Sequence, residues 1–307
     1  MSFAGKIILR FLRTFPHVRN LEKRVDYFEK SCVFPVGHYY SPIVNLEDFR
    51  SQQLLAPTLG DPSADKAIDF NDQQQLNILR SFKDYYNEMP WTYPQKTLRY
   101  QFDNNFFTKD DAITMYGMLR YFKPKKIIEV GVGFSSALLL DTNDHFLNSS
   151  IELTFIDPYP ERLEASLRDN EKVNLLKSRI QDVPLSRFGE LESGDFLLID
   201  TSHVSKSGSD VNYIFFTVFP LLKPGVKVHI HDVFFPFEYP EKWVVENRLS
   251  WNELFLLRAF LSYNEHFRIT FFNTYLRRQY PALYSDAIPF AFGPSDSTSG
   301  GIWIERV

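Results

Sequence analysis

The chain has 307 residues, of which 44% are hydrophobic and 23% are charged; these values are typical of a globular protein and exclude extended disorder and collagen-like repeats. The formal net charge of −4 lacks the basic excess of proteins that bind phosphate backbones, so nucleic acid is disfavoured as a partner. The single cysteine, Cys32, excludes an internal disulfide and a cysteine-rich zinc site, and it favours a reducing, cytoplasmic location. No uninterrupted apolar run reaches the roughly 18 residues that a transmembrane helix needs.

The N-terminal segment has an amphipathic pattern. Apolar residues from Phe3 to Phe15 recur at helical spacing, with Arg10 and Arg13 among the basic residues between them. The arginines interrupt the apolar run that a signal peptide would need. Residues 1–20 therefore predict a helix that either makes weak contact with an anionic membrane surface or packs on its own domain or on a second subunit, as in a homo-oligomer.

Two regions of different character follow one another along the chain. Residues 1–100 show no regular alternation of strands and helices, apart from a helix expected within 71–88, and we interpret them as a helical cap or oligomerisation segment. Residues 101–307 alternate strands with helices and form the second predicted domain. Thr108 is a plausible N-cap for its first helix, which has acids in the first turn and ends before Pro124.

The second region predicts an α/β fold. Its further expected elements are strand 126–130, helix 135–146, strand 151–156, helix 161–169, strand 173–177, helix 185–191, strand 195–199, helix 209–222, strand 226–231, helix 251–263, strand 267–275 and strand 302–306. Strands separated by helices form parallel, right-handed units, so we expect a Rossmann-like, doubly wound, seven-stranded sheet. Because no helix is evident between the last two strands, we expect a terminal antiparallel β-hairpin.

The turn after the first strand is rich in glycine. In open parallel sheets, ligands bind beyond the carboxyl ends of the strands, and here the strand ends in Glu129-Val-Gly131-Val-Gly133 and is followed by Ser135. Glycines let the backbone approach a ligand closely, and the next helix offers free N–H groups. The dinucleotide fingerprint has a further glycine where this chain has Ser136, so the match to an NAD-binding turn is incomplete.

Acidic and histidine residues follow the other strands. Asp157 comes after the second strand, where a carboxylate can accept hydrogen bonds from ribose hydroxyls, and Asp182 comes after the third, where it could reach an adenine amino group. The fourth strand leads into Asp200-Thr-Ser-His203 and the fifth into His229-Ile-His231-Asp232. Polar or glycine residues at five successive strand ends predict a cofactor site.

Together these residues resemble a class I S-adenosylmethionine-dependent methyltransferase. The stretch from Asp200 through Leu222-Lys-Pro-Gly225 to Asp232 is similar, more narrowly, to small-molecule and sugar O-methyltransferases, and the resemblance covers roughly residues 105–307. It implies S-adenosyl-L-methionine as the cofactor, with the glycine turn on its methionine part, the second-strand acid on the ribose and the third-strand acid near the adenine. The cofactor-binding residues implied are Glu129, Gly131, Gly133, Ser135, Asp157, Asp182 and Asp200.

Methyl transfer from a sulfonium needs an aligned acceptor and removal of the acceptor's proton. Candidate catalytic residues are His203, His231 and Asp232; the alternative is that the histidines are structural and none is catalytic. Asp200 and Asp232 could also hold Mg²⁺, which would orient the acceptor and lower the pKa of its hydroxyl. A metal site and a metal-free site both remain open.

An aromatic stretch, Phe234–Trp243, follows the fifth strand. It either stacks on a ring-like acceptor, with Glu238 as a polar handle, or packs against the cap. Tyr39-Tyr40 and Asn104–Phe107 are expected to close the pocket from the other side. We predict O-methylation of a small-molecule acceptor, and a saccharide or glycan precursor is the acceptor that we consider first.

Three other functions remain open from the sequence. One is N-methylation of a small amine, which needs no base. Another is a metal-dependent oxygenase on the same scaffold, using Asp200, His231 and Asp232. The third is a silent scaffold domain, against which the intact glycine turn argues.

Overall fold

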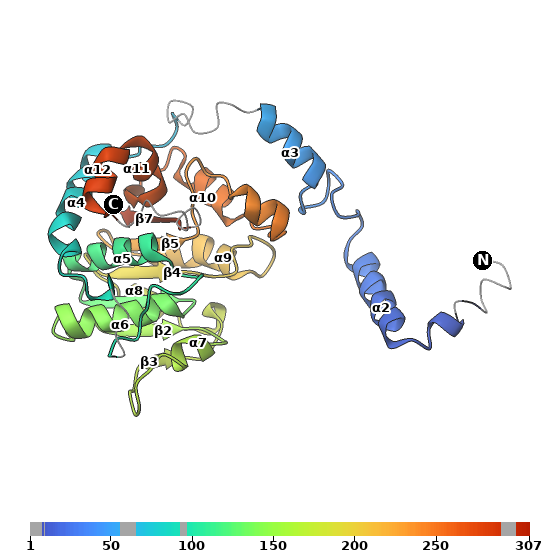
Figure 1. Ribbon diagram of the computed structural model, residues 1–307, viewed down its shortest axis with the longest axis horizontal. Coiled ribbons are helices and arrows are strands. Elements are labelled where there is room, and N and C mark those ends of the chain that lie inside the picture. Colours follow the sequence, from blue (N-terminus) through green and yellow to red (C-terminus); the bar gives the residue numbers. More distant parts are fainter. Residues whose placement is uncertain (1–7, 9, 56–65, 93–96, 290–298) are drawn as a thin grey trace. The chain divides into compact units, whose positions relative to one another are not determined.

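The computed structural model describes residues 8, 10–55, 66–92, 97–289 and 299–307, with side chains omitted at 51–55 and 92. The chain divides into two compact units, Met1–Pro57 and Thr58–Val307 (Figure 1). The first unit contains α2 (Pro16–Ser31) and α3 (Leu46–Leu55). No side chain of α2 is buried, and Leu21 and Val25 are 42% and 55% exposed.

The surface helix expected over residues 1–20 stays a prediction, because residues 1–7 and 9 lie outside the described residues. Where the structure is described in this segment, residues 10–12 are helical and a turn separates them from α2, which has Pro16 at its start. Within the described parts of the chain, no helix has both the length and the apolar character required to cross a bilayer.

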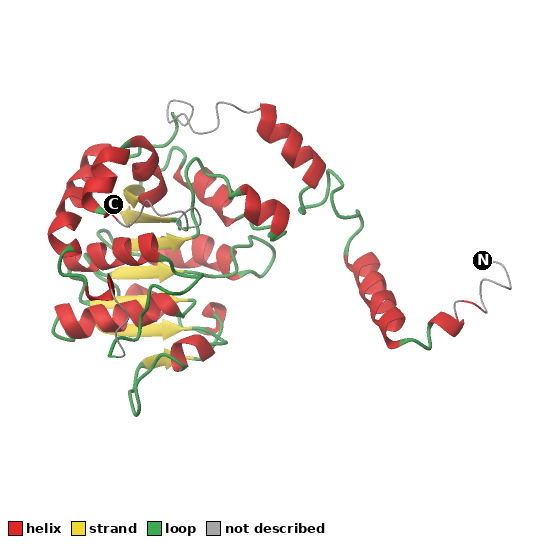
Figure 2. Cartoon of the chain, in the orientation of Figure 1, coloured by secondary structure: helices red, strands yellow, loops and turns green. Residues whose placement is uncertain are grey.

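The second unit is built on one seven-stranded sheet, with helices flanking the strands (Figure 2). The strands are β1 (Lys126–Val130), β2 (Glu152–Ile156), β3 (Asn174–Leu176), β4 (Phe196–Ile199), β5 (Lys227–His231), β6 (Phe267–Phe272) and β7 (Gly301–Arg306). Their order is β3-β2-β1-β4-β5-β7-β6, in which β1 to β5 are parallel and β7 is antiparallel to both β5 and β6. The predicted doubly wound sheet with an antiparallel end is confirmed.

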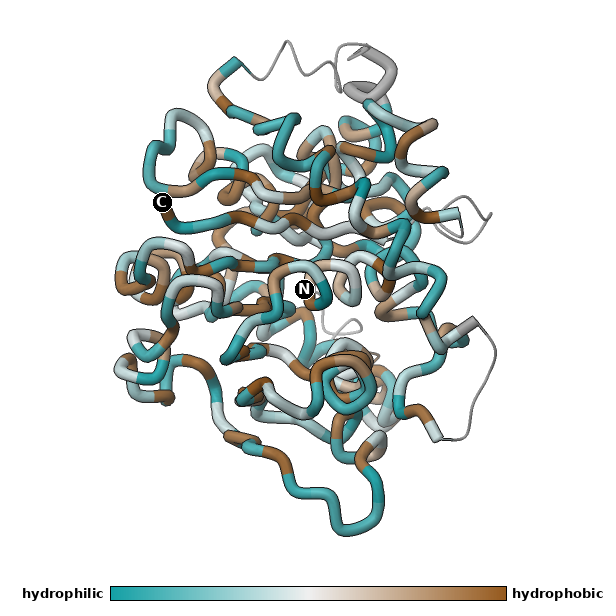
Figure 3. Tube along the Cα trace, turned by 90° about the vertical axis from the view of Figure 1, so that its left-hand side faces the viewer, coloured by the Kyte–Doolittle hydropathy of each residue, from teal (hydrophilic) through white to brown (hydrophobic). Residues whose placement is uncertain are grey.

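The expected helices of this unit form, several of them shorter than predicted, and others are present that the sequence does not predict. The helices are α4 (Asp72–Tyr86), η2 (Pro90–Thr92), α5 (Lys109–Phe122), α6 (Phe134–Phe146), α7 (Glu161–Glu164), η3 (Ile180–Asp182), α8 (Ser186–Gly189), α9 (Asp210–Tyr213), η4 (Ile214–Val218), η5 (Phe219–Leu221), η6 (Lys242–Glu246), α10 (Glu253–Leu261), α11 (Asn273–Gln279) and α12 (Pro281–Ala287). Those that the sequence does not predict are η2, η3, η6, α11 and α12. Along the trace, hydrophobic and hydrophilic residues alternate at short intervals, and several of the outer loops are hydrophilic (Figure 3).

The predicted strand 267–275 is three residues too long, and the connection to β7 is not a tight hairpin. The strand ends at Phe272 because Asn273 begins α11, and the Asn273 side-chain oxygen accepts hydrogen bonds from the main-chain N–H groups of Thr274 and Gly301. Pro281 then begins α12, as proline favours the first helical turn. Two helices therefore connect two strands that still pair antiparallel.

Helix α4 belongs to the sheet-containing unit, although the sequence places the domain boundary at residue 100. Its side chains Ile78, Leu79 and Phe82 are each 1% exposed. A Cβ atom on Gly117 of α5 would lie 2.6 Å from the Phe82 ring, so the missing side chain lets the two helices pack closely. The compact unit consequently begins at Thr58.

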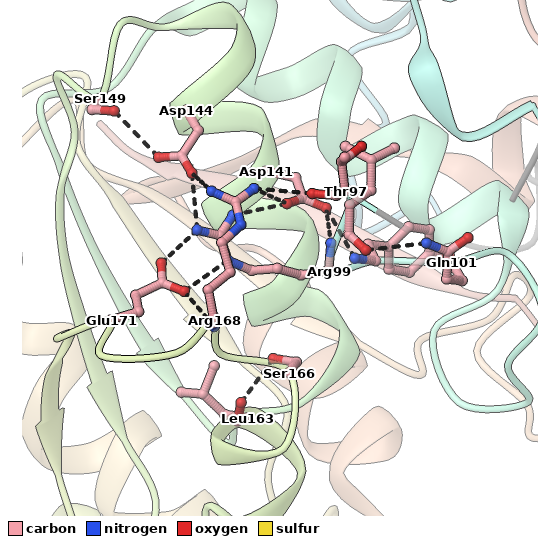
Figure 4. Close-up of polar contacts among 12 residues, drawn as sticks. Thr97, Arg99, Gln101, Asp141, Asp144, Ser149, Leu163, Ser166, Arg168 and Glu171 are labelled. Carbon is pink, nitrogen blue, oxygen red and sulfur yellow. Dashed lines mark hydrogen bonds and ion pairs between the residues drawn. The ribbon is translucent and has the colours of Figure 1, made fainter. Parts of the chain in front are cut away.

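A buried ion-pair network anchors the segment that leads from α4 to α5 (Figure 4). The Arg99 guanidinium, 3% exposed, contacts Asp141 at 2.8 Å, Asp144 at 2.9 Å and Glu171 at 3.1 Å. Asp141 also accepts hydrogen bonds from the main-chain N–H groups of Arg99 and Tyr100, each at 2.9 Å. This network fixes the start of the stretch that carries Phe107 to the carboxyl ends of the strands.

Candidate active site

The glycine turn after β1 presses against the end of β4. Gly131 has φ +81°, and a Cβ atom placed on it would lie 1.6 Å from the main-chain oxygen of Asp200. Only glycine satisfies both the backbone conformation and this close approach. A Cβ on Gly133 would lie 3.0 Å from Cδ of Arg162, which is a tight but less severe contact. The glycines therefore let the turn pack closely on the end of β4 and on Arg162, and their contact with a ligand stays a prediction.

Glu129 is buried beneath this turn. Its carboxylate accepts a hydrogen bond of 2.5 Å from Oγ of Ser136, which in turn accepts one of 3.0 Å from the N–H of Gly133. Burial raises the pKa of Glu129 to about 8. Ser136 therefore connects two predicted cofactor residues from the position where the dinucleotide fingerprint has glycine. Ser135 is also buried and lines the adjoining cavity.

The two acids at the β2 and β3 ends differ in their surroundings. Asp157 accepts hydrogen bonds from the N–H groups of Val132, at 2.9 Å, and Tyr159, at 2.7 Å, so it holds the glycine turn in place. Asp182 lies in η3 on the surface and pairs with Arg179 at 2.8 Å, which lowers its pKa. Their ribose and adenine roles stay predictions.

Four side chains meet at the ends of β4 and β5. Asp200, His231 and Asp232 offer one ligand atom each within 4.8 Å of one another, an arrangement that could hold a metal ion. His203 Nε2 lies 3.2 Å from Asp200 Oδ1 and 3.5 Å from Asp232 Oδ2. Both His203 and Asp232 have a φ of +57°, a conformation that costs energy in residues other than glycine and is enriched at functional sites. The predicted catalytic and metal residues thus form one cluster.

His203 is held from two sides by residues that the sequence did not single out. Its Nδ1 lies 2.9 Å from the Glu253 carboxylate, and its ring packs on Trp251 with ring centroids 4.2 Å apart. The main-chain oxygen of His203 also accepts hydrogen bonds from Asn252 and Glu253 at the start of α10. The backbone of His203 therefore contacts the start of α10 while its ring lies in the cluster, and its catalytic role stays a prediction.

The charges in the cluster shift one another's titration. Burial opposes the charged form of His203, but Asp200 and Glu253 raise its pKa to about 10. Burial likewise opposes the charge of His231, yet Asp232 and Asp200 hold its pKa well above the ordinary value. Burial raises the pKa of Asp232 to about 7. The surrounding protein opposes ionisation of Asp200 as well, but His231 and His203 hold its pKa well below the usual range.

A small cavity connects the glycine turn with this cluster. Its lining includes residues from both, together with apolar side chains; they are Phe107, Met115, Glu129, Ser135, Leu198, Ile199, Asp200, His229 and His231. Phe107, which the sequence places beside the pocket, contacts the His231 ring with centroids 5.2 Å apart. His229 stacks on Trp303, and burial lowers its pKa to about 3, so it remains neutral within the sheet.

The aromatic stretch after β5 is mostly core. Phe235 is 7% exposed and packs on Phe70 and Tyr275, and the Phe237 side chain is fully buried. These rings cannot stack on an acceptor, which corrects that part of the sequence interpretation; within this stretch, Glu238 and Trp243 stay half-buried. Tyr39-Tyr40 belongs to the other compact unit, so its expected position over the pocket stays a prediction.

Comparison with known proteins identifies the central part of the chain. Residues 128–233 match the family model described as "Methyltransferase domain". The chain is 34% identical over 170 residues to a protein of Archaeoglobus fulgidus described as uncharacterized, covering 53% of this chain and 76% of the relative.

Solved structures of methyltransferases are also similar in fold. The Podospora anserina methyltransferase PaMTH1, bound to S-adenosylhomocysteine (SAH), is 14% identical, with 85% of this chain and 95% of that chain covered and a TM-score of 0.40. The O-methyltransferase TomG from Streptomyces achromogenes, in complex with S-adenosylmethionine (SAM), is 12% identical, with 86% and 99% covered and a TM-score of 0.42.

The methyltransferase domain match spans β1 to the residues after β5, and therefore both the glycine turn and the histidine–aspartate cluster. The chain belongs to the class I S-adenosylmethionine-dependent methyltransferases.

Proposed function

We propose that this methyltransferase acts on a hydroxyl group of a small molecule, with saccharides and glycan precursors as the first acceptors to test. The observation that carries the proposal is the histidine–aspartate cluster beside the glycine turn. A hydroxyl must lose its proton as it is methylated, and groups that accept or stabilise that proton are what the cluster supplies. A neutral amine is already a nucleophile and would not need them.

The glycine turn supports the proposed mode of cofactor binding. The absence of a side chain at Gly131 lets the turn pack directly on the main chain of Asp200, and the buried Glu129 and Ser135 line the cavity beside it. SAM supplies a methyl group that its sulfonium already activates. In the proposed arrangement, the turn and Glu129 bind the methionine part, Asp157 binds the ribose and Asp182 lies near the adenine.

The donor set at the strand ends fits a divalent cation. Asp200 and Asp232 would hold it, and carboxylate oxygens suit Mg²⁺, the first cation to test. When bound there, the cation would lower the pKa of a coordinated hydroxyl and offset the negative charge of the two carboxylates. Asp200 is 43% exposed and Asp232 12%, so the site is open to solvent on the side of Asp200.

We assign proton removal to His203 because of its geometry. Glu253 occupies Nδ1, so Nε2 is the ring atom that faces Asp200 and Asp232. Although burial opposes the charge, Asp200 and Glu253 raise the pKa of His203 to about 10, so the ring is charged at neutral pH until a cation at Asp200 and Asp232 offsets the carboxylate charge. The neutral ring would then accept the hydroxyl proton at Nε2 while the methyl group passes from the sulfur of SAM to the acceptor oxygen, which would leave SAH and a protonated imidazole. His231 and Asp232 are the other two candidates for the same proton.

The test is a methylation assay on the full chain with matched acceptors. SAM labelled in its methyl group is offered with pairs such as a sugar and its amino sugar, or a phenol and an aniline, in the presence of Mg²⁺ and then of a chelator. We expect label in the hydroxyl acceptors and loss of turnover with the chelator. Label in the amines alone would establish N-methylation, and an O₂-dependent oxidised product would establish an oxygenase; either result overturns the proposal.

A matched pair of variants tests the base. His203→Gln should lower kcat by about 10²- to 10⁴-fold, the usual range for general-base catalysis. His266→Gln changes an exposed histidine on the loop before β6 and should leave kcat unchanged. Equal activity of the two variants would remove His203 from this role.

A further inference from the structure

We propose that Asp111 orients His231 so that its Nδ1 becomes a third metal ligand, and that the resulting Asp–His–Asp set prefers a transition-metal dication such as Mn²⁺ or Zn²⁺ to Mg²⁺. The inference rests on the cation site proposed above at Asp200 and Asp232. It adds a ligand, a positioning residue and a class of metal to that site.

The first observation is the environment of the His231 ring. The side chain is 4% exposed, and neither ring nitrogen has a hydrogen bond among the described residues. Nδ1 lies 3.6 Å from Asp200 Oδ2 and 3.6 Å from Asp232 Oδ1. Buried polar atoms without a partner are rare in folded proteins, so this nitrogen, which faces the two carboxylates, points to a ligand between them.

The second observation is that a different carboxylate faces the other ring nitrogen. His231 Nε2 lies 3.5 Å from Asp111 Oδ2, and the Asp111 side chain is 3% exposed. Asp111 Oδ2 also accepts a hydrogen bond of 3.3 Å from the N–H of Thr108, while Oδ1 has no partner within the described part of the chain. Asp111 Oδ2 therefore faces the histidine as well as the start of the helix, and the second carboxylate oxygen leaves Asp111 with capacity beyond its capping role.

These positions select one form of the imidazole for metal binding. With its proton on Nε2, directed at Asp111, the neutral ring presents the lone pair of Nδ1 to the space between Asp200 and Asp232. Carboxylates that hold the distal N–H of a ligating histidine fix its orientation in many metal sites, and their loss lowers metal affinity about 10- to 100-fold. The Phe107 ring packs beside His231 and restricts its rotation.

The composition of the ligand set argues for the class of metal. Mg²⁺ favours oxygen ligands and retains several of its waters, whereas imidazole nitrogen suits first-row transition metals. A site with one histidine and two aspartates is therefore better matched to Mn²⁺ or Zn²⁺. Such an ion would supply the same Lewis acidity toward a hydroxyl that the proposed function requires.

The experiment measures metal binding by the chelator-treated full chain, without substrate. Calorimetric titrations with ZnCl₂, MnCl₂ and MgCl₂ should show tighter binding of Zn²⁺ and Mn²⁺ than of Mg²⁺. In the ¹⁵N-histidine NMR spectrum of the Zn²⁺-loaded protein, His231 Nδ1 should take a metal-bound shift and Nε2 should keep its proton. Coordination through Nε2, or no shift of His231, would overturn the inference in the wild-type protein itself.

Variants separate positioning from helix capping. Asp111→Asn should weaken Zn²⁺ binding about 10- to 100-fold and change Mg²⁺ binding less than threefold. Thr108→Ala removes the other half of the capping box but keeps Asp111, so it should leave Zn²⁺ binding unchanged. Equal Zn²⁺ affinity of these two variants would contradict the role of Asp111.

The same titrations show which proposal has failed. If no divalent cation binds, or if binding survives both Asp200→Ala and Asp232→Ala, the cation site of the proposed function is wrong and this inference falls with it. If Zn²⁺ binding depends on those aspartates but not on His231, as judged with His231→Ala, the cation site stands and only the inference is overturned.

Discussion

The main-chain oxygen of Asp200 occupies the space that a side chain at Gly131 would need, since a Cβ there would lie 1.6 Å away. The proposed cofactor turn and the first aspartate of the proposed cation site are therefore in direct contact. A change in the turn must displace the end of β4, so in the proposed arrangement the cofactor site and the acceptor site would be altered together.

Gly131→Ala should destabilise the fold and weaken SAH binding. The added methyl group must displace backbone, and φ +81° is unfavourable for alanine, so we expect a loss of about 2–4 kcal/mol in the free energy of unfolding. Gly189→Ala in α8 is the control, because a Cβ there meets nothing within 4 Å. Denaturant unfolding and SAH calorimetry measure both effects, and a wild-type-like Gly131→Ala protein would contradict the packing described.

Asp157→Ala should lower SAH affinity at least about tenfold, which corresponds to about 1.4 kcal/mol. The variant loses the proposed ribose acceptor and also the hydrogen bond to the N–H of Val132 that orders the turn. Asp169→Ala, at an exposed position in the loop after α7, should leave affinity unchanged. Unaltered binding by Asp157→Ala in calorimetry would remove this residue from the cofactor site.

Glu129 should make stability depend on pH in a specific direction. Burial raises its pKa from an ordinary value of 4.5 to about 8 in the folded chain, so between these values the folded state binds more protons than the unfolded state. Its stabilising contribution is complete below pH 4.5 and is lost as the pH rises through 8.

Glu129→Gln removes this titration while keeping an oxygen for Ser136. Relative to wild type, the variant should therefore gain at least about 1 kcal/mol of stability between pH 5 and pH 9. The surface variant Glu152→Gln should show no such gain. Parallel stability curves for wild type and Glu129→Gln, measured by urea unfolding across this range, would show that Glu129 does not titrate as described.

Arg99→Met should be strongly destabilising because it leaves the buried Asp141 with only the more distant Arg168, whose guanidinium lies 3.8 Å away. Breaking one partner of a buried ion pair costs roughly 3–5 kcal/mol. Lys83→Met disrupts an exposed pair with Asp286, whose side chains are 59% and 63% exposed, and should cost less than about 1 kcal/mol. Thermal unfolding compares the two, and similar small losses would mean that the Arg99 network contributes little.

Local sequence patterns were sufficient for most of the sheet but not for its connections. The β-branched run at Lys126–Val130 predicts a strand, and the acid-rich first turn of α5 predicts a helix start. Both elements form where expected. Strand β6 is shorter than its sequence pattern predicts, because the start of α11 depends on Asn273, whose side chain accepts a hydrogen bond from Gly301 in the distant β7. Such contacts between residues far apart in sequence have no local signature.

The candidate site, like the fold, could be predicted from the sequence only in part. Topology alone places Asp200, His203, His231 and Asp232 at neighbouring strand ends, and the structure brings all four together. The sequence does not indicate Glu253 and Asp111 as partners of the histidines, because each has the pattern of an ordinary acid in the first turn of a helix. Only the fold reveals that these helix starts face the cluster.

Calorimetric titration of the full chain with SAH, with and without a divalent cation and beside NADH as a control, tests the cofactor site most directly. We expect one SAH to bind per chain, with much weaker binding to Asp157→Ala and none of NADH. Binding of NADH in place of SAH would contradict the assignment of the glycine turn and the strand ends to SAM.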